Sequence, residues 1–110
     1  MSRETRRLRL HADFLAIAGN AYFQPPASIS MRYPCIVYHY RGDSVFHADN
    51  KLYKMIDEYE ATLITKDPMP DEMIDAIINL PYARYDRHYI GDNLHHYLFT
   101  IKVIERNTNV

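Results

Sequence analysis

The sequence predicts an α+β domain in which a mixed, mainly antiparallel β-sheet is packed by two helices. Two stretches, 2–18 and 67–81, have apolar residues at helical spacing. The segments between and after them alternate apolar and polar residues, as strands do when one face of a sheet is buried. The last two such segments are separated only by Gly91-Asp92-Asn93, which is typical of a hairpin. The expected order is α-β-β-β-α-β-β, with an extended β-hairpin in the middle of the chain.

The first helix is expected over residues 2–18. Ser2 is a suitable N-cap, and Gly19 is suited to end the helix. One apolar stripe should face the sheet, and it consists of Leu10, Phe14, Ile17 and Ala18, with Leu8 and Leu15 beside it.

Four arginines crowd the first half of this helix, at Arg3, Arg6, Arg7 and Arg9. Cations near a helix N-terminus oppose the helix dipole, so these residues do not stabilise the isolated helix. They form either a solvated face or a contact surface. The pattern favours the solvated face, which Glu4 partly neutralises.

The chain between the helices is expected to be mostly strand. A short strand covers 20–24, and Pro25-Pro26 then forces a loop, because proline cannot continue a sheet ladder. The next strand covers 33–40, and Arg41-Gly42-Asp43 is expected to be a turn or loop.

Residues 43–58 are ambiguous. They form either a long β-hairpin turned at Asp49-Asn50 or a flexible loop, and long loops of this kind are often functional. The strand that follows, 59–66, is clearer because Tyr59, Ala61 and Leu63 fall on one face.

The second helix opens within 67–72 on prolines and acidic residues that suit a first helical turn, and Pro81 prevents its continuation. Its apolar stripe should face the sheet and consists of Met73, Ile74, Ile77, Ile78 and Leu80.

The final hairpin should divide its residues by strict alternation. The first strand then has Ala83, Tyr85, Arg87 and Tyr89 on one face. In the second strand Tyr97, Phe99, Ile101 and Val103 share a face. Tyr85, Tyr97 and Phe99 are expected toward the core, with Arg87, His88 and Tyr89 available to a neighbour. Residues 105–110 are expected to form a flexible tail.

Bulk properties restrict the class of protein. A chain of 110 residues is one domain, here 1–110, and it can bury a modest core. The net charge of −1 lacks the basic excess of a nucleic-acid-binding domain. One cysteine excludes an internal disulfide and fits a reducing compartment. No apolar run has the length of a signal peptide or a membrane span, so a soluble protein made in the cytoplasm is expected.

The search for chemistry gives no enzyme. A cluster of His88, Asp92, His95 and His96 suggests a metal, but adjacent histidines on a strand point to opposite faces. His88 and His95 could approach each other across the hairpin, where a structural hydrogen bond is favoured over a metal. Asp86, Arg87 and Asp92 fit ordinary cross-strand charge pairs. The sequence has neither a nucleophile elbow nor a phosphate loop, so no catalytic residue, metal or cofactor is expected.

Ten tyrosines and four phenylalanines are many for a small chain. Tyrosine combines an apolar body with a polar tip, and it suits both the edge of a core and an interface. Some of these tyrosines are therefore expected to face another protein surface, with sheet-edge packing as the equal alternative.

Taken together, the pieces AYFQPP, YPCIVY, DNKLY, YEATLITKDP and RYDRHYIGDNLHHYLFTIKV resemble the tail terminator (tail completion) proteins of long-tailed phages and prophages. The resemblance covers residues 8–104 and rests on the order and spacing of the pieces. It implies a homohexameric ring that caps the tail tube, ends its polymerisation and provides the surface that docks on the head. The hairpin in 36–56 would reach toward a neighbouring subunit or toward the tube.

The same resemblance implies partners and a location. The partners are further copies of the chain, the tail tube protein and the head–tail connector or stopper, with a weak contact to DNA in the ring lumen and no membrane. The location is the virion, at the head-proximal end of the tail. The expected interface residues are Tyr38, Tyr40, Tyr53, Arg87 and Tyr89. A head–tail connector or stopper protein is the alternative, and a small metal-dependent or nucleic-acid-binding protein is the distant third.

Overall fold

A computed structural model describes residues 2–48 and 51–106, the side chains of 45–48, 51–54 and 105–106 excepted. The elements are α1 (Arg3–Ala18), β1 (Ala21–Phe23), β2 (Cys35–Ala48), β3 (Lys51–Thr65), α2 (Asp71–Ile78), β4 (Ala83–Gly91) and β5 (Leu94–Arg106). This order and the mixed five-stranded sheet confirm the predicted α+β class.

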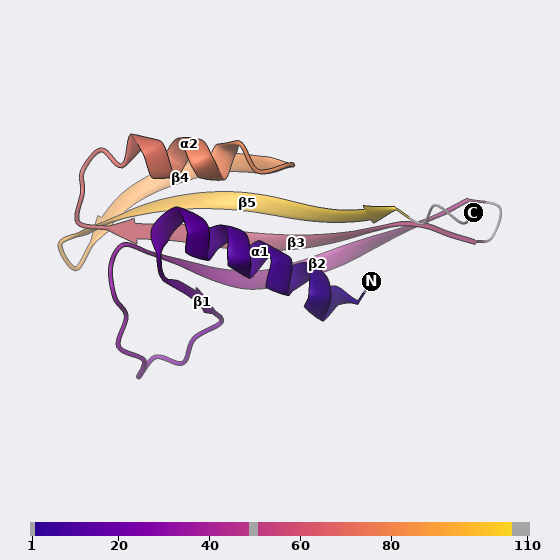
Figure 1. Ribbon diagram of the computed structural model, residues 1–110, viewed down its shortest axis with the longest axis horizontal. Helices are drawn as coiled ribbons and strands as arrows, with labels where there is room; N and C mark the ends of the chain where they lie inside the picture. The colour runs from indigo at the N-terminus through magenta and orange to yellow at the C-terminus, as the bar shows by residue number, and fades with distance from the viewer. Residues whose placement is uncertain (1, 49–50, 107–110) are drawn as a thin grey trace.

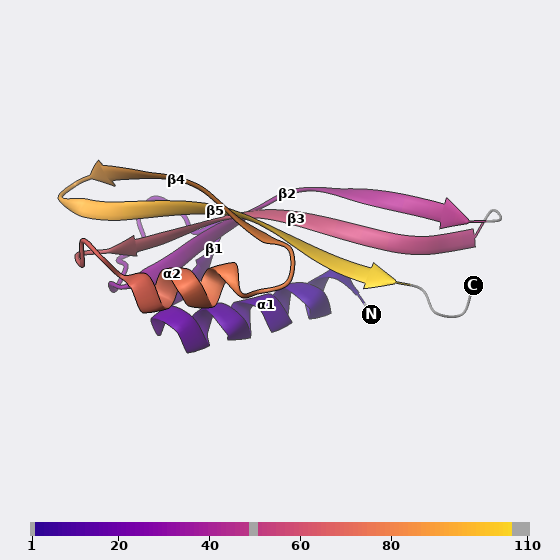
Figure 2. The ribbon, with the colours of Figure 1, turned by 90° about the horizontal axis from the view of Figure 1, so that it is seen from above.

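The strands lie in the order β1-β2-β3-β5-β4. β1 runs parallel to β2, and each of the other neighbouring pairs is antiparallel. Both helices lie on the same face of the sheet (Figures 1 and 2). The chain is therefore a two-layer structure in which β1 and β4 form the two margins of the sheet.

The ends of α1 form as the sequence predicts. The Ser2 hydroxyl accepts a hydrogen bond from the backbone N–H of Thr5, and Gly19, at φ 84°, donates its N–H to the carbonyl of Leu15. The buried stripe contains Leu10, Phe14 and Ala18, whereas Leu8 and Leu15 are exposed.

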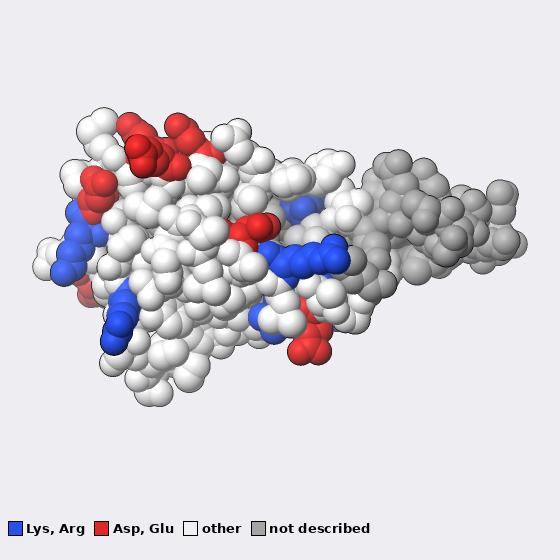
Figure 3. Space-filling view, in the orientation of Figure 1, with Lys and Arg blue, Asp and Glu red and all other residues white. Residues whose placement is uncertain are grey.

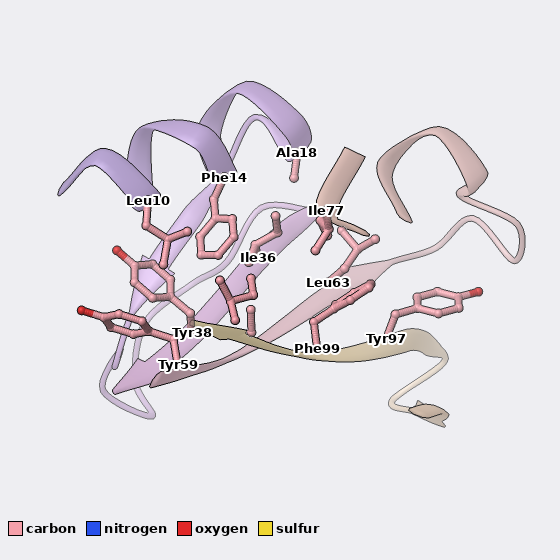
Figure 4. Close-up of a cluster of buried hydrophobic side chains, with 12 residues drawn as sticks. Leu10, Phe14, Ala18, Ile36, Tyr38, Tyr59, Leu63, Ile77, Tyr97 and Phe99 are labelled. Carbon is pink, nitrogen blue, oxygen red and sulfur yellow. The ribbon is translucent and has the colours of Figure 1, made fainter. Parts of the chain in front are cut away.

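The core lies between the helices and the sheet (Figure 4). Phe14 of α1 meets the ring of Tyr38 edge-on, with ring centres 5.0 Å apart. Ile36, Leu63 and Phe99 of three neighbouring strands complete the floor, and α2 contributes Ile77. Each such side chain contributes roughly 1.5–3 kcal/mol by leaving water, so this face dominates the stability of the fold.

β2 continues through the predicted turn. Arg41, Gly42 and Asp43 are strand residues, and a bulge between Tyr40 and Gly42 absorbs the irregularity. Gly42 has φ 145°, which suits glycine at such a bulge. The prediction of a turn was wrong because the long antiparallel pairing with β3 holds these residues in the ladder. The hairpin alternative for 43–58 is confirmed, while its turn residues Asp49 and Asn50 lie outside the described residues.

β2, β3 and β5 extend beyond the part of the sheet that β1 and β4 border (Figure 2). We call this extension the ribbon: residues 41–48, 51–58 and 102–106. Glu105 and Arg106 pair with Met55 and Lys54, so these two residues belong to β5 and not to the predicted tail. The remaining tail residues, 107–110, lie outside the described part of the chain.

The second helix and the last hairpin differ from prediction in detail. Ile77 is buried but Ile78 is 44% exposed, because α2 is a short helix that presents only one side to the sheet. The chain reverses between β4 and β5 at Asp92 and Asn93, with φ of 53° and 62°. Gly91 pairs with Leu94 as the last residue of its strand. The reversal is thus a two-residue turn that relies on the tolerance of Asp and Asn for positive φ.

Candidate assembly surface

β4 is a long edge strand. Within the described part of the chain it pairs with β5 alone, and its residues from Arg84 to Ile90 are all exposed. Several of them are large and apolar, with Tyr85 and Tyr89 each 43% exposed and Ile90 65% exposed. Tyr82, just before the strand, is 63% exposed. Proteins usually make such edges short and charged, because unpaired backbone groups beside apolar side chains invite another strand.

A bulge at Asp86 divides β4 and changes which face its residues occupy. Tyr85 pairs with Phe99 and the next paired residue, Arg87, lies opposite Leu98. Tyr85 therefore packs against Phe99 on the helix-covered face, with ring centres 5.5 Å apart, as predicted. Arg87 and Tyr89 lie on the opposite face, which corrects the prediction that they share a face with Tyr85. Strict alternation failed because the bulge inserts one extra residue.

Hydrogen bonds hold the bulge. Thr100 donates to a carboxylate oxygen of Asp86 at 2.6 Å, and Nε of Arg84 donates to the other oxygen at 2.8 Å. Burial by itself raises the pKa of Asp86, but these two hydrogen bonds and the charge of Arg84 outweigh it, so the pKa is lowered overall. The carboxylate therefore links the bulge of β4 to Thr100 of β5.

The outer half of β4 combines an aromatic ring with a cation. Tyr89 stacks on His96 of β5, with ring centres 4.5 Å apart and planes 10° apart. The guanidinium of Arg87 lies 5.7 Å from the centre of the Tyr89 ring. Both predicted interface residues of this strand are thus exposed, and their side chains lie next to each other.

On the helix-covered face of the same hairpin, His88 and His95 meet. Nε2 of His88 and Nδ1 of His95 are 3.0 Å apart, and the ring planes differ by 12°. The ring of Tyr97 stacks on His88. The predicted hydrogen bond across the hairpin is confirmed, as is the separation of His95 from His96. Within the described residues, no three His, Cys, Asp or Glu side chains gather as a metal site would require.

The other predicted interface residues lie around β2 and β3. Tyr38 is fully buried and belongs to the core, where its hydroxyl accepts a hydrogen bond from Arg7 and lies 2.6 Å from Nδ1 of His11. Tyr40 is half-buried under the guanidinium of Arg3, 4.9 Å from the ring centre. The side chain of Tyr53 lies outside the described residues.

Two of the four arginines of α1, Arg3 and Arg6, form ion pairs with the sheet, which corrects the prediction that they form a solvated face. Arg6 is 3% exposed, and its Nε is 2.6 Å from a carboxylate oxygen of the fully buried Asp57. Arg3 pairs with Asp43 and lies 3.5 Å from Asp57. The pairing of Arg6 with Asp57 was not predicted, although the sequence contains a signal for it. Asp57 has the same parity as Tyr59, so it occupies the core-facing side of β3.

Charges of both signs are interspersed over the helix-bearing side, and acidic side chains gather over α2 (Figure 3). This view lacks the single-sign field typical of a nucleic-acid-binding surface. Among the described residues, neither helix has the length and apolar character needed to cross a membrane.

Comparison with known proteins gives no family. No family model matches the chain, and no curated protein is significantly similar to it.

Proposed function

We propose that the protein is a structural subunit of a phage tail, which forms a ring on the end of the tail tube, ends its polymerisation and docks on the head. The family resemblance in residues 8–104 motivates the proposal. The observation that carries it is the exposed β4 edge, where Tyr85, Tyr89 and Ile90 remain in contact with water in the single chain. A surface of this composition fits assembly, because interface centres are rich in Tyr and Arg.

The ribbon supports the same reading. Its outer part extends the sheet beyond both helices, and so it presents backbone at a distance from the helix-covered core (Figure 2). A ring needs two different patches on each subunit, one for each neighbour. β4 and the ribbon are two such patches, and they differ in position and in composition.

Deletion of the gene in its phage tests the function. Tails of uncontrolled length that remain unattached to filled heads are expected in electron micrographs. Expression of the wild-type chain from a plasmid should restore tails of normal length. Free tails of normal length beside filled heads that leak DNA would instead assign the protein to the head side, as a connector or stopper.

Oligomerisation is tested separately, by mass photometry of the purified chain with and without isolated tail tubes. We expect a ring of six subunits, either free or bound to tube ends. A chain that stays monomeric under both conditions would contradict the ring.

A further inference from the structure

The sheet has two open edges within the described residues. One is the outer edge of β4, which pairs with β5 alone. The other is the outer edge of β2 beyond Tyr40, because β1 pairs only with Ile36–Tyr38. The side-chain oxygen of Gln24 accepts a hydrogen bond from the backbone N–H of Tyr40, and beyond this contact the outer edge of β2 has no neighbouring strand among the described residues. Each open edge presents backbone donors and acceptors that another strand can use.

The two edges are compatible in direction. β4 runs antiparallel to β5, which runs antiparallel to β3, so β4 points the same way as β3. β2 points the opposite way. When a second copy is placed beside the first so that the sheet continues, its β2 therefore meets β4 in antiparallel sense. The copy need not be turned over, and antiparallel pairing is the more stable kind.

The two edges also match in extent and differ in level. β4 has a regular stretch after its bulge, Arg87–Gly91, and the free edge of β2 has one of the same length, Gly42–Phe46, before a register shift between Phe46 and His47. When the residue pairs are followed from β4 across β5 and β3 to β2, the residues of β4 after the bulge fall in line with the first residues of β2, which β1 covers. Pairing Arg87–Gly91 with the free part of β2, which begins at Gly42 opposite Glu58, thus needs a stagger of about eight residues, roughly 26 Å at ~3.3 Å per residue. A repeated stagger is what a closed sheet of tilted strands requires.

Pairing of β4 with itself fits less well. A two-fold contact would place the cations Arg84 and Arg87 of both copies along one seam, where like charges destabilise cross-strand pairs. It would also set the Asp86 bulges of both copies in the same short contact. Such a dimer is closed, and the free edge of β2 would stay unpaired.

From these observations we propose that β4 of one subunit pairs with the outer edge of β2 beyond Tyr40 in the next copy, which joins the subunit sheets into one closed sheet. The inference rests on the proposed ring and specifies which edges form it. The partner is a second copy of this chain.

Cysteine cross-linking tests the pairing, because the chain has a single native cysteine that is inert. Cys35 is fully buried, and burial raises the pKa of its thiol to about 11. The variant Ser44→Cys places a thiol on the free edge of β2, and Ile90→Cys places one on β4. Since the register is not fixed, His88→Cys and Tyr89→Cys are combined with Ser44→Cys as well.

The experiment is mild oxidation of each double variant, with isolated tail tubes present, followed by non-reducing electrophoresis. At least one of the three double variants should give a ladder of cross-linked subunits up to the ring. Mixing the two single variants should give dimers only. The control is Ser44→Cys with Leu8→Cys, since Leu8 is 51% exposed and lies on α1, which packs mainly on α2, β1 and β2 and not on β4. It should give no ladder.

The other outcomes are distinct. A dimer from Ile90→Cys alone would mean that β4 pairs with itself, and it would overturn the inference. A cross-link only to the tube subunit would overturn it as well. A ring seen by mass photometry without a ladder from any double variant would refute this edge pairing and leave the proposed function standing. Absence of any oligomer would refute the proposed ring first, and the edge pairing with it.

Discussion

The helix-covered face of the sheet and the β4 edge use similar residue types in opposite ways. Tyr59 and Tyr38 on the covered face are fully buried, whereas Tyr85 and Tyr89 along β4 are each 43% exposed. The covered face has helices packed on it, and the β4 edge has one neighbouring strand, β5, among the residues that the structure describes. Substitutions on the covered face should therefore change the free energy of unfolding, and those on the edge should change assembly.

The largest effect on stability is expected from Asp57→Ala on the covered face. The variant removes the carboxylate beside the buried guanidinium of Arg6 and should lower the free energy of unfolding by about 3 kcal/mol. Urea denaturation measures the loss. The double variant Arg6→Met/Asp57→Leu should recover most of it, because an apolar pair of similar volume avoids burying charge. A single variant within about 1 kcal/mol of wild type would contradict the structural role of the pair.

Two buried tyrosines should respond differently to loss of their hydroxyl. The Tyr38 hydroxyl contacts Arg7 and His11, so Tyr38→Phe should lower the free energy of unfolding by about 1–2 kcal/mol. The Tyr59 hydroxyl is buried without a hydrogen bond among the described residues, and burial and Asp57 raise its pKa to about 12. Tyr59→Phe should thus be neutral or stabilising by up to about 1 kcal/mol. Equal losses in thermal denaturation of the two variants would refute the distinction.

A smaller, pH-dependent effect is expected from His11. Burial and the charge of Arg7 lower its pKa below the ordinary 6.5. As pH falls below about 6.5, the unfolded chain takes up a proton that the folded chain does not, so stability should decrease toward the lowered pKa. Melting temperatures from pH 7.5 to 5 measure this slope. His11→Asn, whose side-chain oxygen can replace Nδ1, should reduce the slope; an unchanged slope would exclude His11 as its source.

The smallest effect on stability, and the largest on assembly, is expected at the edge. Ile90→Lys should change the free energy of unfolding by no more than about 0.5 kcal/mol, because the side chain is already 65% exposed. It should weaken assembly about tenfold or more, since a lysine in an interface loses its hydration. The matched control is Leu8→Lys on α1, which is 51% exposed and lies on a helix that packs mainly on α2, β1 and β2 and not on β4. Equal assembly of Ile90→Lys and wild type would remove β4 from the interface.

Much of the fold could be predicted because it depends on local patterns. The Ser2 and Gly19 ends of α1 follow from backbone chemistry within a few residues, and Tyr59, Ala61 and Leu63 follow from the two-residue period of a strand. The exposure of Arg87 and Tyr89 was also predictable. They remain predictions as interface residues, since a single chain shows exposure and not contact.

The failures have a common cause, which is dependence on a distant strand or helix. Arg41–Asp43 resembles a turn locally, but pairing with β3 keeps it in a strand. Arg6 resembles a surface residue in the sequence of α1 alone. In the fold it is buried, because it pairs with Asp57 at a core-facing position of β3. The bulge at Asp86 depends on Thr100, fourteen residues further along the chain, and it moves Arg87 and Tyr89 to the other face.

By itself, then, the sequence determined the helices, most of the strands and the apolar face that unites them, because those features repeat with the period of the backbone. Only the tertiary structure decided the length of the ribbon, the burial of the Arg6–Asp57 pair and the face on which each residue of β4 lies. Strand pairing or an ion pair between residues remote in the chain produces no repeating pattern in the sequence of either segment alone. It exists only once packing brings the two together.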